Sequence, residues 1–144
     1  MIKNIKYKIL LVLFVISLAS SMALSIVPEQ ELCSIQSGCE VVHYSSYNYT
    51  FGIQNSYYGV VIFFFLSAFT LFYLIKPSMG KKAFINLAII IGFVISLYFM
   101  YVQVFLLKAF CKYCLVVDLS VIISLILIIP ELRKGFLEAK SKKA

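Results

Sequence analysis

Four cysteines are the residues of this sequence best suited to chemistry, and they fall into two pairs. Cys33 and Cys39 are separated by five residues, whereas Cys111 and Cys114 form a Cys-x-x-Cys motif. Two thiols at positions i and i+3 of a helix share a face and lie close enough for a disulfide. Because thiol–disulfide exchange passes electrons through mixed disulfides, two such pairs can act as a relay. The spacing therefore favours redox chemistry.

The neighbours of Cys111 and Cys114 favour the thiolate form of a cysteine. Cys114 falls in the first turn of an apolar helix, where the helix dipole favours an anion. Lys108 and Lys112 add positive charge nearby. The thiolate is the nucleophile in exchange reactions. At the membrane boundary it could reach a ligand dissolved in the lipid, so we expect this pair to meet such a ligand.

Cys33 and Cys39 lie in a glycine-containing loop that we expect to be exposed to solvent. A disulfide there could be attacked by the thiolate of a soluble protein, and could also swing toward Cys111. Two other roles stay open for the four thiols, a pair of structural disulfides and a zinc site. Structural zinc is usually held by two short-spaced cysteine pairs in a small soluble knuckle. Since one pair here opens an apolar helix, we expect no metal.

The composition predicts an integral membrane protein. Hydrophobic residues make up 62% of the 144 residues and charged residues 13%, whereas soluble domains have about half and about a quarter. The net charge is +7, but the charge lies at the ends of the apolar runs. We therefore expect a lipid bilayer, and no nucleic acid, as the partner of this surface.

Four apolar segments are long enough to cross a bilayer. They run from about 9 to 27, 57 to 75, 84 to 107 and 110 to 129, and we expect Pro28 and Pro130 to end the first and the last. We predict an all-α membrane protein, with residues 1–144 forming a single four-helix bundle. An outer loop over 28–56 carries a short half-helix near Glu40–Tyr44, and a tail covers 130–144.

The lysines and arginines indicate the orientation of the bundle. Two of the 13, Lys108 and Lys112, fall on one side, and 13 − 2 = 11 fall on the other: Lys3, Lys6, Lys8, Lys76, Lys81, Lys82, Arg133, Lys134, Lys140, Lys142 and Lys143. The positive-inside rule places the richer side in the cytoplasm. We therefore expect both termini to be cytoplasmic and all four cysteines to face the oxidising outer side of the cell membrane.

A cleaved signal peptide is the alternative for the N-terminus. The segment has a basic start, an apolar stretch and small residues between Ala19 and Ala23. Cleavage would leave three spans. The apolar run continues to Val27, however, which is longer than a signal core needs. An even number of spans also places every basic segment on one side.

Taken in order, these residues resemble the short bacterial form of the vitamin K epoxide reductase family. Prokaryotic members share the five-residue spacing of the loop cysteines and a serine six positions after the second one, here Ser45. The stretch Phe51-Gly-Ile-Gln-Asn-Ser is similar to the family's Phe-Gly-Ile-Pro-Asn-Ser before the second span. Phe110-Cys-Lys-Tyr-Cys is similar to the family's Phe-Cys-x-Tyr-Cys at the fourth. The resemblance covers the chain from about Cys33 to Cys114.

The resemblance implies a four-helix bundle around a quinone, either menaquinone or ubiquinone. Cys114 would react with the quinone, and Cys111 would exchange with the loop pair. Cys33 and Cys39 would take electrons from a thioredoxin-like, DsbA-like protein outside the membrane. Ser45 and Asn55 match family positions near the quinone, where they would hydrogen-bond to the quinone or to the loop backbone.

Three departures from the family pattern affect these expectations. Gln54 replaces the usual proline, so the turn before the second span is expected to be looser. Many members carry a fused thioredoxin-like domain and this chain shows none, so the partner is expected to be a separate protein. Asp118 lies one turn after Cys114, where the family is usually neutral. A buried acid in a membrane is often functional, so Asp118 is either a proton donor to the quinone or a neutral, hydrogen-bonded acid.

Several functions fit these residues. The first is an enzyme that generates disulfides, passing electrons from a secreted substrate through a thioredoxin-like oxidase and both cysteine pairs to quinone. The second reverses the flow and reduces quinone or its epoxide with thiols. A DsbB-type oxidase has its close cysteine pair in the first outer loop, which is the opposite order. A disulfide-stapled membrane scaffold would be non-enzymatic. His43, the single histidine, is either a proton shuttle near the loop cysteines or a solvated loop residue.

Overall fold

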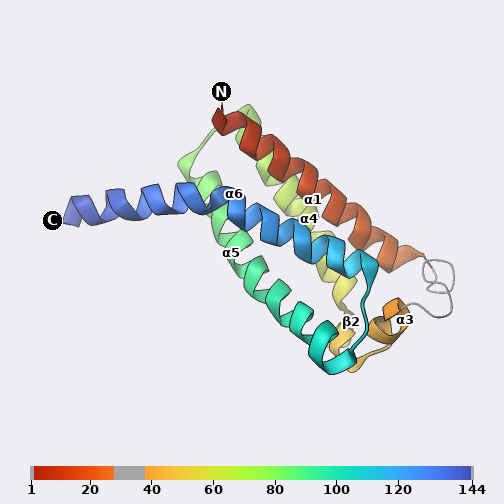
Figure 1. Cartoon of the computed structure of the whole chain (residues 1–144). Helices are drawn as coiled ribbons and strands as arrows, with labels where there is room; N and C mark the ends of the chain where they lie inside the picture. The colour runs from red at the N-terminus through yellow and green to blue at the C-terminus, as the bar shows by residue number, and fades with distance from the viewer. Residues whose placement is uncertain (1, 28–37, 144) are drawn as a thin grey trace.

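The computed structural model of the protein describes residues 2–27 and 38–143 (Figure 1). The long helices are α1 (Ile2–Ile26), α4 (Asn55–Ile75), α5 (Met79–Tyr101) and α6 (Lys112–Lys143). Shorter elements are the helix α3 (Gly38–His43), the 3-10 turn η1 (Ser46–Asn48), the strands β1 (Tyr49–Thr50) and β2 (Ile53–Gln54), and the π-helical turn η2 (Val102–Leu107).

Four segments are long and apolar enough to cross a membrane, which confirms the four-span, all-α prediction. They are Ile5–Ile26, Asn55–Ile75, Met79–Leu107 and Lys112–Gly135. The third begins five residues earlier than predicted because a helix backbone continues beyond the apolar stretch that defines a span. Lys81 lies in this added turn, and its Nζ donates to the backbone oxygens of Phe72 and Lys76.

The prediction that Pro130 ends the last helix was wrong, because α6 continues through it to Lys143. A proline inside a helix removes one backbone hydrogen bond and crowds the preceding turn. The residues that follow, Glu131 to Lys134, are mostly good helix formers, so the helix resumes. Figure 1 shows this part of α6 projecting beyond the other helices.

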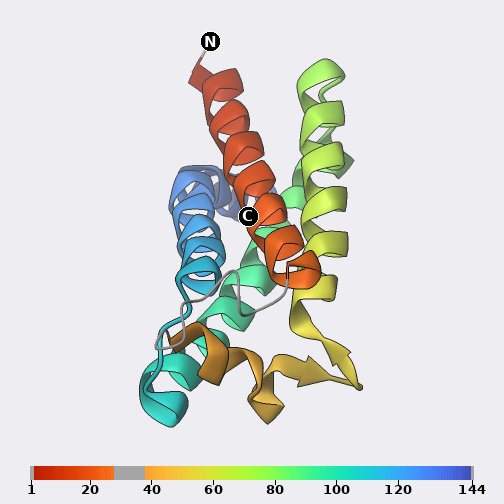
Figure 2. The same ribbon diagram turned by 90° about the vertical axis from the view of Figure 1, so that its right-hand side faces the viewer.

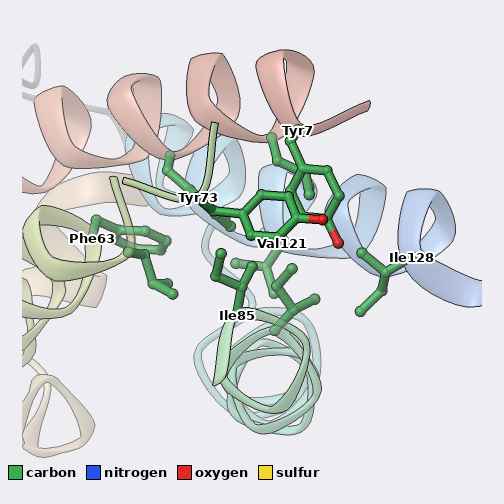
Figure 3. Packing of buried hydrophobic residues seen from close by; sticks show 10 residues of the cluster. Tyr7, Phe63, Tyr73, Ile85, Val121 and Ile128 are labelled. Atoms are coloured by element: carbon green, nitrogen blue, oxygen red, sulfur yellow. The ribbon is translucent and has the colours of Figure 1, made fainter. Parts of the chain in front are cut away.

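The long helices pack around an apolar core. Helix α1 lies against α4 and α6, and α5 lies against α6 and α4. Buried side chains from all four fill the space between them (Figure 3), among them Tyr7, Phe63, Ile85 and Val121. The α1–α4 crossing is close: a Cβ at Gly59 would lie 2.7 Å from Oγ of Ser21. Small residues of this kind let membrane helices approach each other closely.

A polar contact joins the helices at the end where the chain begins. Oε2 of Glu131 lies 2.7 Å from Nζ of Lys82 and accepts a 3.0 Å hydrogen bond from the hydroxyl of Tyr7. The ring of Tyr7 also packs on Tyr73, with centroids 4.3 Å apart (Figure 3). These contacts link α1, α4, α5 and α6. They hold α6 at the residue that follows its proline.

A small cap covers the opposite end of the bundle. Figure 2 shows α3, the two short strands and the turn after α5 gathered there. Helix α3 confirms the predicted half-helix, although it begins at Gly38 rather than near residue 40. The strands pair antiparallel around Phe51 and Gly52, which both have positive φ, at 54° and 78°. Two such residues are typical of a tight hairpin turn, which the sequence analysis did not predict.

Candidate thiol redox site

Three cysteines come together beneath the cap. Sγ of Cys39 lies 3.2 Å from Sγ of Cys111, and Sγ of Cys111 accepts a 3.4 Å hydrogen bond from the backbone N–H of Cys114. A disulfide bond is about 2.05 Å long, so neither of these two contacts is a disulfide and the three sulfur groups lie in close contact. The predicted fourth member, Cys33, lies outside the described residues. Residues separated by 72 positions in the sequence thus meet at one point.

The close approach of Cys39 depends on the glycine that precedes it. A Cβ added at Gly38 would lie 2.6 Å from the backbone nitrogen of Phe110 and 3.0 Å from its oxygen. Both atoms belong to the backbone, so neither can rotate away as a side chain would. A glycine at position 38 lets α3 rest directly on the connection that carries Cys111.

Replacing Gly38 by alanine should therefore slow exchange between Cys39 and Cys111 by about tenfold or more, since overpacking of this kind displaces the backbone. The rate of Cys39–Cys111 disulfide formation, followed by mass spectrometry of thiol-blocked protein, measures the effect. Gly80→Ala is the matched control, because a Cβ there meets nothing within 4 Å. Equal rates in the two variants would show that the close packing of α3 does not control the exchange.

Cys111 occupies the N-cap of α6 and is not part of the helix itself. Its carbonyl accepts the 2.9 Å bond from the N–H of Leu115, and its thiol accepts from the N–H of Cys114 in the first turn. A side chain that accepts from the third helical residue is a capping interaction. Cys114 does lie in the first turn, as predicted. The two cysteines meet through this cap and do not share a helix face.

Burial changes the chemistry of Cys111. Cys39 and Cys111 are 4% and 2% exposed, and Cys114 is half-buried. The side-chain hydrogen bond with the Cys114 thiol, followed by burial, raises the pKa of the Cys111 thiol above its usual range, while the backbone N–H of Cys114 acts in the opposite direction. Cys111 lies before the first turn of α6, whereas the sequence favoured a thiolate at Cys114, which lies within that turn.

A cavity of about 420 Å³ opens beside these thiols. Its walls come from the cap and from the long helices and are mainly apolar, with a few polar groups. They include all the predicted site residues that the structure describes: Cys39, Ser45, Asn55, Cys111, Cys114 and Asp118. This size and this mixture of apolar and polar groups suit a small aromatic ligand. The cavity therefore fits the ring of a quinone.

Ser45 and Asn55 both fasten the cap. Oγ of Ser45 donates a 2.7 Å bond to the carbonyl of Val42, at the end of α3. The amide of Asn55 accepts from the hydroxyl of Thr50 at 2.7 Å and donates to the carbonyl of Tyr47 at 2.9 Å. The sequence left open whether these residues hydrogen-bond to the quinone or to the loop backbone. The bonds described here are of the second kind.

Asp118 is buried on α6, with 5% of its surface exposed. Its Oδ2 lies 3.5 Å from Nε2 of Gln103, which donates to it. The sequence analysis passed over Gln103, although an amide within an apolar span was a usable signal. Another cavity residue, Ser56, has a buried hydroxyl that makes no hydrogen bond within the described part of the chain.

His43 closes the cap side of the cavity. Its ring contacts the side-chain amide of Gln54, the residue that replaces the family's proline, and packs edge-on against Tyr44. Gln54 therefore gives the turn before α4 a polar contact of its own. Within residues 2–27 and 38–143, no group of three or more His, Cys, Asp or Glu side chains could hold a metal ion.

The comparison with known families agrees with this arrangement. The vitamin K epoxide reductase family matches residues 8–129, a range that includes most of α1 and both ends of the thiol site. The chain belongs to this family. Members are membrane oxidoreductases that act on thiols, disulfides and quinones. Comparisons with curated proteins and with solved structures gave no match.

Proposed function

We propose that this protein oxidises the thiols of a separate thioredoxin-like, DsbA-like protein and passes the electrons to a membrane quinone. The observation that carries the proposal is the 3.2 Å contact between Cys39 and Cys111, at the wall of a cavity that Cys114 also lines. A disulfide-stapled scaffold would not need the cavity beside the thiols. Family membership supports the same chemistry.

The relay requires two exchanges and a final oxidation. A partner dithiol reduces the Cys33–Cys39 disulfide, and the partner leaves as a disulfide. The Cys39 thiolate then attacks Cys111 in the Cys111–Cys114 disulfide and releases Cys114 as a thiolate. Cys33 attacks Cys39, which closes the loop disulfide and leaves Cys111 and Cys114 reduced. Each cycle moves two electrons and two protons.

The reduced pair lies beside the cavity that would hold the quinone. Menaquinone and ubiquinone both accept two electrons and two protons when bound, becoming quinols. Cys114 lines the cavity and is the residue we assign to deliver the electrons. Ser45 and Asn55 hold the cap over the ring, and Asp118 would supply a proton from the apolar side. The alternative for Asp118 is a neutral acid that only hydrogen-bonds within the bundle.

The proposed setting is the cell membrane, with the cap outside and both termini in the cytoplasm. Eleven of the 13 lysines and arginines support this orientation. The exterior must be kept oxidising for secreted proteins to form disulfides, and a quinone-linked route provides the electron sink. We assign the whole of residues 1–144 to one membrane domain that performs this task.

One experiment tests direction and sidedness together. A reduced thioredoxin-like protein is added outside sealed right-side-out vesicles that contain the membrane protein. It should drive quinone reduction at least about tenfold faster than in vesicles without the membrane protein. In inverted vesicles the same addition should give only the background rate, because a soluble protein cannot cross the bilayer. Quinone absorbance measures both rates. Activity confined to inverted vesicles would show that the cap faces the cytoplasm.

A further inference from the structure

Gln103 is the residue around which the connection to Cys111 is built. It lies in the π-helical turn η2 and is 2% exposed. Its backbone carbonyl accepts from the N–H of Lys108 and, at 3.1 Å, from that of Ala109. Its side-chain Oε1 accepts from the N–H of Cys111 at 3.2 Å. A single residue thus pairs three backbone donors of the segment that carries the thiol.

The other end of the same amide reaches Asp118. Nε2 of Gln103 donates to Oδ2 of Asp118 at 3.5 Å, and both side chains line the cavity. The amide group therefore bridges the backbone of Cys111 and the carboxyl group in the cavity wall. Ser96, another residue of the cavity wall, is a second hydrogen-bond partner of Asp118.

Glutamine suits this position because the bridge needs an acceptor and a donor on one rigid plane. Glutamate would keep the acceptor for Cys111 but would lose the donor toward Asp118. Methionine has a similar length and would lose both. The π-helical turn that carries Gln103 is consistent with such a role, because turns of this kind are rare and are often found at functional sites.

We infer that Gln103 is a positioning residue for thiol-to-quinone electron transfer, holding Cys111 against Cys39 at one end and Asp118 at the cavity wall at the other. This inference rests on the proposed function. Gln103 itself exchanges no electrons. Its side chain fixes the geometry of two groups that take part in different half-reactions.

The two halves of the bridge can be separated by substitution. Gln103→Met should slow both Cys39–Cys111 exchange and single-turnover quinone reduction by prereduced protein, each by about tenfold for the loss of one buried hydrogen bond. Gln103→Glu should keep exchange within about twofold of the unmodified protein, because its carboxylate still accepts from Cys111, and should slow only quinone reduction. Leu106→Met, on the exposed side of the same turn, is the control.

A double-substitution cycle distinguishes positioning from general destabilisation. In an Asp118→Asn background, Gln103→Met should slow quinone reduction by less than about twofold further, while exchange still slows by about tenfold. The inference would be overturned if Gln103→Glu slowed both half-reactions as much as Gln103→Met does. Unchanged rates in Gln103→Met would also overturn it. If the unmodified protein reduces no quinone, the proposed function fails instead, and the exchange rate still tests the hold on Cys111.

Discussion

Replacing Cys114 by alanine is expected to lower thiol-driven quinone reduction to the background rate, a loss of more than about a thousandfold. Both thiols of the pair line the cavity, but Cys114 is half-buried whereas Cys111 is almost fully buried. Without Cys114, the Cys111–Cys114 disulfide cannot form, so the pair cannot pass two electrons to the quinone. The rate of quinone absorbance change with a reduced thioredoxin-like donor measures the loss.

The same variant should accumulate a Cys39–Cys111 disulfide. Cys111 can still attack the loop disulfide at Cys39, 3.2 Å away, which releases Cys33, but Cys114 is no longer present to resolve the mixed disulfide by attacking Cys111. Non-reducing peptide mapping after thiol blocking detects the cross-link. Leu119→Ala, on the exposed side of α6, controls for general damage to the helix. Quinone reduction at the normal rate in Cys114→Ala would show that the assigned site is wrong.

Replacing Cys39 by alanine should separate the two halves of the relay. Turnover with a protein thiol donor is expected to fall by more than about a hundredfold, because the route from the loop pair to Cys111 is removed. Protein whose Cys111 and Cys114 have been reduced chemically should still reduce one equivalent of quinone, within about twofold of the normal rate. Stopped-flow absorbance of the quinone measures the single turnover.

Val41→Ala provides the matched control for Cys39→Ala. Val41 lies on the same short helix, and about half of its surface is exposed. Its replacement should leave both the steady-state and the single-turnover rates unchanged. If the donor protein still drives Cys39→Ala at full rate, electrons reach Cys111 by another route and the loop pair is not an intermediate.

The sequence alone predicted the membrane spans well because the bilayer imposes a one-dimensional rule. About 20 consecutive apolar residues are needed to cross it, and that pattern is visible without knowledge of contacts. The same rule failed at Pro130, where the apolar run stops but the helix does not. The anchoring of Glu131 by Lys82 and Tyr7 joins residues far apart in the sequence.

The cysteine spacing likewise indicated the chemistry, and only the tertiary structure decided how the thiols meet. The sequence placed Cys111 and Cys114 on one face of a helix, whereas the folded chain makes Cys111 a buried N-cap with a raised pKa. The cap can approach because Gly38 carries no side chain against the backbone of Phe110. Periodicity along the chain does not reveal such a contact.

What the sequence by itself determined is therefore the kind of residue available and the medium that surrounds it: two thiol pairs and four apolar spans. The tertiary structure decided the distances, bringing Cys39 to 3.2 Å from Cys111 and placing Gln103 between Cys111 and Asp118. Span and motif are local properties of the chain. Reactivity depends on contacts between distant segments, which exist only after the helices have packed.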